Sequence, residues 1–389
     1  MQSNKKLSVL SYCAFFYLGI LYTNWGIYLL YMHSTYHITI TTLGYLFVIP
    51  SLFQGFTTYL NGHFLNRVNL KTQLSYSLLL TVISLGIMAS SHTILLLIIA
   101  MILIGIAFGI MEGLINYIIV TIFPTQKFSK LNVLNFFYSF GAIVGPAYAG
   151  ILLNISWPWQ WVMFITLLFG IFLLFFNSKI SYGTFGNPHE NPSDTKIIWH
   201  FSIYLIAASM VLYVLSGSIF SFWIVAYLQK TYGFSIGLAS FSLTLFWIFI
   251  AAGRALSGIF KKLKIYNFIM VFALIAFFAN IGVLFIHSAT ALFILIPIMG
   301  IGNSCLYAST LAYGTEQLKY NCPKLLSVLV VASNIGLILA FPLSTFFVHN
   351  FGMFISLLIG ALLMVVLVVV ILLTLLDKNN PYSTKYQSH

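Results

Sequence analysis

Long apolar runs separated by short polar breaks constrain this chain more than any other feature. A helix that crosses a bilayer needs about 20 mostly apolar residues. Twelve such stretches occur, at residues 7–31, 41–64, 73–91, 93–122, 131–154, 159–178, 199–229, 236–258, 265–287, 290–314, 324–348 and 352–376. Only 6% of the residues are charged, against roughly a quarter in a water-soluble domain. The sequence therefore predicts an all-α membrane protein of twelve spanning helices.

The positions of the basic residues predict which side of the membrane each loop faces. Loops rich in Lys and Arg stay in the cytoplasm. With a cytoplasmic N-terminus, 16 of the 17 Lys and Arg residues fall on that side, and Lys230 falls outside. An odd number of spans would destroy this bias, so both termini are predicted to be cytoplasmic. The net charge of +12 reflects this topology and does not indicate nucleic-acid binding.

Two six-helix bundles joined by a linker are the predicted organisation. The longest stretch without a span, 178–196, contains Gly and Pro residues together with Glu190 and Asp194. These two acidic residues are predicted to be solvated, and so is Asp377 at the end of the last span. The predicted parts are an N-terminal bundle at 1–178, a cytoplasmic linker at 179–198, a C-terminal bundle at 199–377 and a cytoplasmic tail at 378–389.

An internal repeat supports these two bundles. When the sequence is shifted by 195 residues, several features coincide. The coinciding pairs are Gly105 with Gly300, Gly141 with Gly336, and Tyr28 with Trp223. Two related halves are the architecture of transporters that rock around a site near the midplane of the membrane.

A segment between the second and third predicted spans resembles a known signature. Gly62-His-Phe-Leu-Asn66-Arg67-Val-Asn-Leu-Lys71 is similar to the Gly-x-x-x-Asp-Arg signature of the major facilitator superfamily, with Asn66 in place of the usual Asp. The resemblance extends over nearly the whole chain. It implies the major facilitator fold, transport by alternating access, and a cytoplasmic gate. The predicted gate residues are Asn66, Arg67, Lys71, Arg254, Lys261, Lys262 and Glu316.

Three further segments resemble one branch of that superfamily, the fucose:proton symporters and their glucose-carrying relatives. They are Met111-Glu112-Gly-Leu-Ile-Asn116, Leu131-Asn-Val-Leu-Asn135-Phe-Phe-Tyr138-Ser-Phe-Gly141-Ala, and Ser242-Leu-Thr-Leu-Phe-Trp247 followed by Gly253-Arg254. The chain lacks the acidic residue of this branch in the first span, and Ser216 and Gly217 stand where relatives often carry Glu. Proton coupling would then depend on a single carboxyl group.

Glu112 is the acidic residue that the sequence places inside a span, at the middle of 93–122. A charge there costs roughly 2.5–3.5 kcal/mol on insertion scales, and such residues mark ion or proton paths. A carboxyl group is neutral when apolar surroundings bury it and ionised when water reaches it. We therefore expect Glu112 to carry the coupled proton, with Asn116 one helical turn away. The alternative is a permanently protonated acid that only donates a hydrogen bond.

Amide and aromatic side chains at similar depth predict a cavity for a neutral, hydroxyl-bearing solute such as a sugar. The same side chains can instead connect helices to one another. The predicted cavity residues are Asn24, Trp25, Tyr28, Gln54, Asn116, Asn135, Tyr138, Trp223, Tyr227, Trp247, Asn303, Tyr307 and Asn334. Trp157, Trp159, Trp161 and Trp199 are predicted to form an interfacial belt.

Two other functions compete with solute uptake. The segment from Gly141 to Gly150, with Gly145-Pro146 at its centre, resembles the helix 5 signature of drug:proton antiporters, so efflux of drugs or other amphipathic metabolites is the alternative. A sensor on the same fold would need an output domain. No nucleophile–base pair, metal cluster or phosphate loop indicates an enzyme. The sequence therefore predicts a monomeric transporter in the bacterial cell membrane, in contact with lipid, without a cofactor and driven by a proton gradient.

Overall fold

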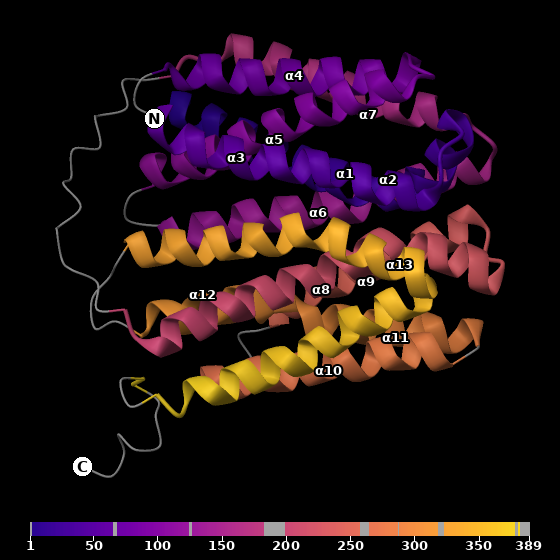
Figure 1. The fold of residues 1–389 in the computed structure, drawn as a ribbon. Coiled ribbons are helices and arrows are strands. Elements are labelled where there is room, and N and C mark those ends of the chain that lie inside the picture. Colours follow the sequence, from indigo (N-terminus) through magenta and orange to yellow (C-terminus); the bar gives the residue numbers. More distant parts are fainter. Residues whose placement is uncertain are drawn as a thin grey trace. The chain divides into compact units, whose positions relative to one another are not determined.

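All regular elements are α-helices in the part of the chain that the structure, a computed structural model, describes: residues 2–64, 68–123, 127–182, 199–256, 264–286, 288–317, 323–377 and 380–381 (Figure 1). The helices are α1 (Gln2–Tyr36), α2 (Ile40–Leu46), α3 (Val48–Phe64), α4 (Leu70–Ser90), α5 (Ile94–Ile122), α6 (Lys127–Asn154), α7 (Trp159–Lys179), α8 (Phe201–Tyr232), α9 (Ile236–Leu256), α10 (Ile265–Phe285), α11 (Ala289–Ser304), α12 (Leu306–Thr315) and α13 (Pro323–Thr374).

Eleven helical stretches within these residues are long and apolar enough to cross a membrane. The number differs from twelve because the last two predicted spans form one element, α13. Gly352 interrupts α13 with a φ of 87° and a ψ of 169°, a conformation that essentially only glycine adopts. The chain reverses its direction within α13, between its orange and yellow parts (Figure 1). Two spans that meet at Gly352 are consistent with this reversal, and twelve crossings stay a prediction.

Two predicted spans are interrupted helices. The span at 41–64 consists of α2 and α3, which meet at Phe47, and the span at 290–314 consists of α11 and α12, which meet at Cys305. Neither break was expected, because a hydropathy pattern does not report where a helix bends.

The chain divides into two compact units. The first comprises Met1–Asn187 with Leu228–Thr244, and the second Pro188–Tyr227 with Leu245–His389. In the first unit α1 packs on α6, α3 on α5, and α4 on α5 and α7; in the second α10 packs on α11 and α13. The predicted bundle boundaries stay a prediction.

The internal repeat recurs as a set of helix contacts, each within one unit. At the four glycines of the two repeat pairs, the facing helix is so close that a Cβ atom would collide with one of its carbonyl oxygens. The paired glycines are 195 residues apart, and the residues that they contact are 195 or 196 residues apart. The contacts are Gly141 on Phe16 and Gly336 on Val211, and Gly105 on Pro50 and Gly300 on Phe246.

Two predicted environments are wrong. Trp159 does not belong to an interfacial belt, because it is 3% exposed and its Nε1 donates to Thr35 Oγ1 over 2.9 Å. Asp377 is not simply solvated: its Oδ2 accepts the backbone N–H of Ser202 over 2.8 Å, in the first turn of α8. A carboxylate at that position compensates the unpaired amides of a helix N-terminus.

Candidate functional site

Close packing of α3 on α5 builds the candidate proton site. Gly105, Gly109 and Gly113 recur every fourth residue along α5, and such small residues allow two helix backbones to approach closely. A Cβ atom on Gly109 would lie 2.5 Å from the carbonyl oxygen of Gln54. Thr58 Oγ1 also donates to the carbonyl of Gly109 over 3.4 Å. The glycine positions therefore determine how close Gln54 comes to α5.

Gln54 contacts the carboxyl group of Glu112 directly. Its Nε2 donates to Glu112 Oε2 over 2.9 Å, and Gln54 is 4% exposed whereas Glu112 is half-buried. The side chain of Asn116 instead donates to the backbone carbonyl of Glu112 over 2.8 Å. The structure therefore joins two predicted residues, Glu112 and Gln54, and places the Asn116 amide on the backbone rather than on the carboxyl group.

Tyr22 of α1 completes this cluster. Its side chain lies close to those of Gln54 and Glu112. Its ring centroid lies 4.9 Å from that of Phe108 and 6.0 Å from that of the predicted Tyr138. Tyr22, Glu112 and Tyr138 are each half-buried. Tyr22 is not among the predicted residues, because a tyrosine in a span rich in aromatic residues carries no signal of a polar contact.

No basic side chain pairs with Glu112 among the residues that the structure describes. Its side chain accepts its hydrogen bond from the neutral amide of Gln54. A buried carboxyl group without an opposite charge can change its protonation state without breaking an ion pair. The arrangement is therefore chemically suited to binding and releasing a proton.

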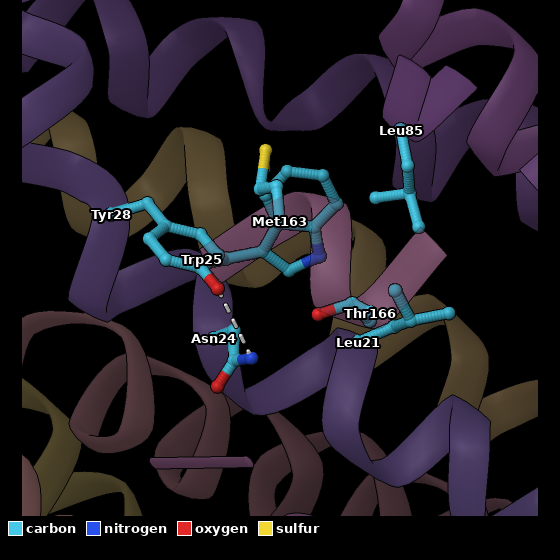
Figure 2. Close-up of a pocket in the computed structure, with 7 residues that line it drawn as sticks. All are labelled: Leu21, Asn24, Trp25, Tyr28, Leu85, Met163 and Thr166. Carbon is cyan, nitrogen blue, oxygen red and sulfur yellow. Dashed lines mark hydrogen bonds between the residues drawn. The ribbon is translucent and has the colours of Figure 1, made fainter. Parts of the chain in front are cut away.

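A second polar cluster lies beside a small pocket in the first unit (Figure 2). The amide nitrogen of Asn24 donates to the hydroxyls of Tyr28 over 3.4 Å and of Tyr148 over 3.2 Å. Tyr148 is in turn hydrogen-bonded to Thr166. Asn24 is 3% exposed, so these contacts connect α1 to α6 and α7. The residues that line the pocket are Leu21, Asn24, Trp25, Tyr28, Leu85, Met163 and Thr166.

Two predicted aromatic residues of the second unit, Trp223 and Tyr227, are buried. Trp223 is fully buried, and its Nε1 donates to Ser344 Oγ over 2.9 Å. Tyr227 is 3% exposed. Trp247 is half-buried, with its ring centroid 5.8 Å from that of Phe246.

The break between α11 and α12 gathers three predicted residues. Asn303 lies just before the break and Tyr307 just after it. Arg254 Nε donates to the carbonyl of Ser304 over 3.0 Å, and Tyr213 Oη donates to that of Asn303 over 3.2 Å. A helix break frees such carbonyls, and in a membrane other parts of the protein must satisfy them.

The remaining predicted residues have separate surroundings. Asn135 is exposed and donates to the carbonyl of Leu131 in its own helix over 3.0 Å, and Asn334 is half-buried in α13. Lys71 Nζ donates to the carbonyls of Ser178 and Ile180 over 2.8 and 2.9 Å, and so caps the end of α7. Glu316 is exposed. Asn66, Arg67, Lys261 and Lys262 lie outside the described residues.

Comparison with known proteins agrees with this architecture. Residues 10–321 match the Major Facilitator Superfamily. A "Protein TsgA homolog" from Buchnera aphidicola subsp. Baizongia pistaciae (strain Bp) is 27% identical over 362 residues, 92% of each chain. Another from Yersinia enterocolitica is 23% identical over 356 residues, 90% of each chain.

Solved structures share the fold. Two crystal structures of the nucleoside transporter NupG, one of them of a mutant, align with TM-scores of 0.75 and 0.78 at 16% identity, over 96% of this chain and 99% of theirs. A bacterial homolog of the human lysosomal transporter Spinster, in an inward-facing and occupied conformation, aligns with a TM-score of 0.73 at 14% identity, over 97% of each chain.

A multi-pass, all-helical membrane protein with two related halves and a carboxyl group inside a span has the features expected of a secondary transporter. The chain is a member of the Major Facilitator Superfamily, since the family match covers most of its length. It is therefore a transporter and not an enzyme.

Proposed function

We propose that this transporter carries a small neutral, hydroxyl-bearing solute, most simply a sugar, into the cell together with a proton held by Glu112. The hydrogen bond of 2.9 Å from Gln54 to Glu112 carries the proposal. It places a carboxyl group without a basic partner, among the described residues, next to neutral polar side chains. The protein is proposed to act as a monomer in the bacterial cell membrane, without a cofactor, because the proton gradient supplies the energy.

The chemistry of the surrounding side chains supports a neutral solute. Half-buried Glu112, Tyr22 and Tyr138 offer one acid and two hydroxyls on aromatic rings. Sugar hydroxyls need donors and acceptors, and the C–H faces of sugars pack against aromatic rings. A nucleoside is also neutral and contains a ribose, and NupG is a nucleoside transporter. Nucleosides therefore belong among the solutes to be tested beside sugars.

Substitution of Glu112 tests proton coupling. In proteoliposomes with an imposed pH gradient, Glu112→Gln should abolish uphill accumulation of labelled fucose, glucose or uridine, whichever the unmodified protein accumulates. It should leave exchange of that solute across the membrane largely intact, because exchange needs no net proton movement. Glu190→Gln, a matched change in the linker, should accumulate solute normally. Accumulation by Glu112→Gln at the unmodified rate would contradict the proposal.

A further inference from the structure

We propose that the small pocket of the first unit binds a single water molecule, held between Trp25 of α1 and Thr166 of α7 (Figure 2). Four of the residues that line this pocket come from α1, one comes from α4 and two come from α7. The inference is independent of the proposed function, because it concerns how these helices are joined inside one unit.

The size of the pocket suits a water molecule. Its cavity volume is about 10 Å³, and a cavity needs roughly 10–15 Å³ of such space to hold one water. A sugar or a nucleoside is many times larger, so neither fits there. Cavities with purely apolar walls stay dry, and the polar groups that line this one therefore decide whether water binds.

Trp25 supplies a hydrogen-bond donor that faces the pocket. Its side chain is 6% exposed, and Figure 2 shows the indole nitrogen on the side of Leu85 and Thr166. An indole N–H can only donate, and within the described part of the chain no group accepts from it. The buried indoles of Trp159 and Trp223 each donate to a hydroxyl. The corresponding acceptor for Trp25 is a water oxygen in the pocket.

Thr166 supplies an acceptor for the same water. Its hydroxyl donates to the carbonyl of Val162 in its own helix over 3.2 Å. The bond between Thr166 and Tyr148 is therefore donated by the Tyr148 hydroxyl. A hydroxyl oxygen has two lone pairs, and the bond from Tyr148 uses one of them. The second lone pair of Thr166 can accept from a water molecule.

Tyr28 supplies a second donor. Its oxygen accepts from the amide nitrogen of Asn24 over 3.4 Å, and the residues described here offer no acceptor for its O–H. Tyr28 lines the pocket together with Trp25 and Thr166. A water that accepts from Trp25 and Tyr28 and donates to Thr166 makes three hydrogen bonds, which is the usual number for a buried water.

This water extends a hydrogen-bonded chain that connects three helices. Asn24 of α1 donates to Tyr148 of α6, which donates to Thr166 of α7, and the water returns from Thr166 to Trp25 of α1. A water-mediated bond is nearly as favourable as a direct one. Asn24, Trp25 and Tyr28 therefore hold α1 in place and do not contact the transported solute.

Ultraviolet resonance Raman spectroscopy of the full-length protein tests for the water, because an indole band reports whether the N–H is hydrogen-bonded. The spectrum of Trp25→Phe, subtracted from that of the unmodified protein, isolates the Trp25 signal. This signal should be that of a hydrogen-bonded indole. Leu85→Phe fills the pocket and should move the band to its non-bonded position. Leu79→Phe, the same change at an exposed position of α4, should leave the band unchanged.

Three results of this experiment would overturn the proposal. A non-bonded indole in the unmodified protein would show that the pocket is dry. A bonded indole in Leu85→Phe would place the acceptor outside the pocket. A band that moves when fucose, glucose or uridine is added would show that Trp25 contacts the solute instead. None of these results would change the predicted role of Glu112.

A double-mutant cycle on thermal unfolding tests the bridge from Trp25 to Thr166. The two side chains share no direct hydrogen bond, so a nonadditive effect of Trp25→Phe and Thr166→Val requires a shared partner. We expect coupling of about 2- to 12-fold in the unfolding equilibrium constant, as for one hydrogen bond. Thr166→Ser keeps the hydroxyl, so its cycle with Trp25→Phe should be additive. Additive effects in the Thr166→Val cycle would contradict the bridge.

Discussion

Glu112 and Trp223 are polar side chains inside apolar helices, and each has a hydrogen-bond partner on another helix. Glu112 accepts from Gln54, and Trp223 donates to Ser344. A buried polar group without a partner is costly, and hydrocarbon offers no water to replace it. Glu112 differs from Trp223 because it is half-buried rather than fully enclosed, and this difference favours a functional role for the acid and a structural role for the indole.

Trp223 and Ser344 form a pair whose strength can be measured. Trp223→Phe and Ser344→Ala should each destabilise the protein, and the double variant should cost less than the sum of the two. We expect a coupling free energy of about 0.6–1.7 kcal/mol, the range found for hydrogen bonds between membrane helices. The measurement is a double-mutant cycle on unfolding in detergent. A coupling energy of zero would show that the bond does not stabilise the fold.

Residue chemistry alone predicted part of the site. A lone Glu in a 30-residue apolar run was predictable from the cost of burying its charge, and Gln54 was predictable as polar at similar depth. The partner of Glu112 was not predictable from the sequence. Gln54 is 58 positions away, and packing between helices determines which side chains of α3 face α5. The cavity prediction for Tyr28 and Trp223 rests on residue type; Tyr28 lines the small pocket of the first unit, and Trp223 bonds to Ser344 within the second.

At the scale of elements, the glycines of α5 determine the distance from α3. Gly109→Ala should move these helices apart, because its Cβ would meet the carbonyl of Gln54 at 2.5 Å. We expect a loss of about 1–3 kcal/mol of stability from such overpacking, together with weaker proton coupling. Gly217→Ala in α8 is the control, since no atom lies within 4 Å of its Cβ position. Thermal unfolding and uphill transport are the readouts, and equal stability of the two variants would contradict this packing argument.

Arg254 holds the break between α11 and α12 through the carbonyl of Ser304. Thr58 makes the corresponding bond to the carbonyl of Gly109 in the first unit. Thr58 and Arg254 are 196 residues apart, and Gly109 and Ser304 are 195 apart. Arg254→Met should therefore leave a freed carbonyl unsatisfied and loosen the start of α12. We expect faster amide hydrogen exchange around Ser309, whose N–H bonds to Cys305. Unchanged exchange there, with transport lost, would favour the predicted gate role instead.

The helix positions were largely predictable and their interruptions were not. Apolar runs of about 20 residues mark spans because the bilayer fixes their length. The breaks at Phe47 and Cys305 occur within apolar sequence, so hydropathy gives no sign of them. Gly352 was a visible signal, since glycine is the residue that adopts a positive φ without strain, and the predicted last span begins there.

At the scale of the whole molecule, the reversal of α13 at Gly352 decides between eleven and twelve crossings. Twelve crossings place both termini in the cytoplasm and Asn350 at the outer surface. In a variant without native cysteines, Asn350→Cys should react with a membrane-impermeant thiol reagent added to intact cells, and Ser178→Cys should react only after permeabilisation. Both positions are exposed. Labelling of Asn350→Cys from the inside alone would contradict the predicted topology.

The central claim is that solute and proton cross together through a site that contains Glu112. The most direct measurement uses proteoliposomes with a pH-sensitive dye inside and a panel of fucose, hexoses, disaccharides, nucleosides and cationic drugs outside. One neutral solute should acidify the lumen, and Glu112→Gln should abolish that signal. Silence for every neutral solute, with drug movement driven in exchange for protons, would contradict the account and assign the chain to efflux.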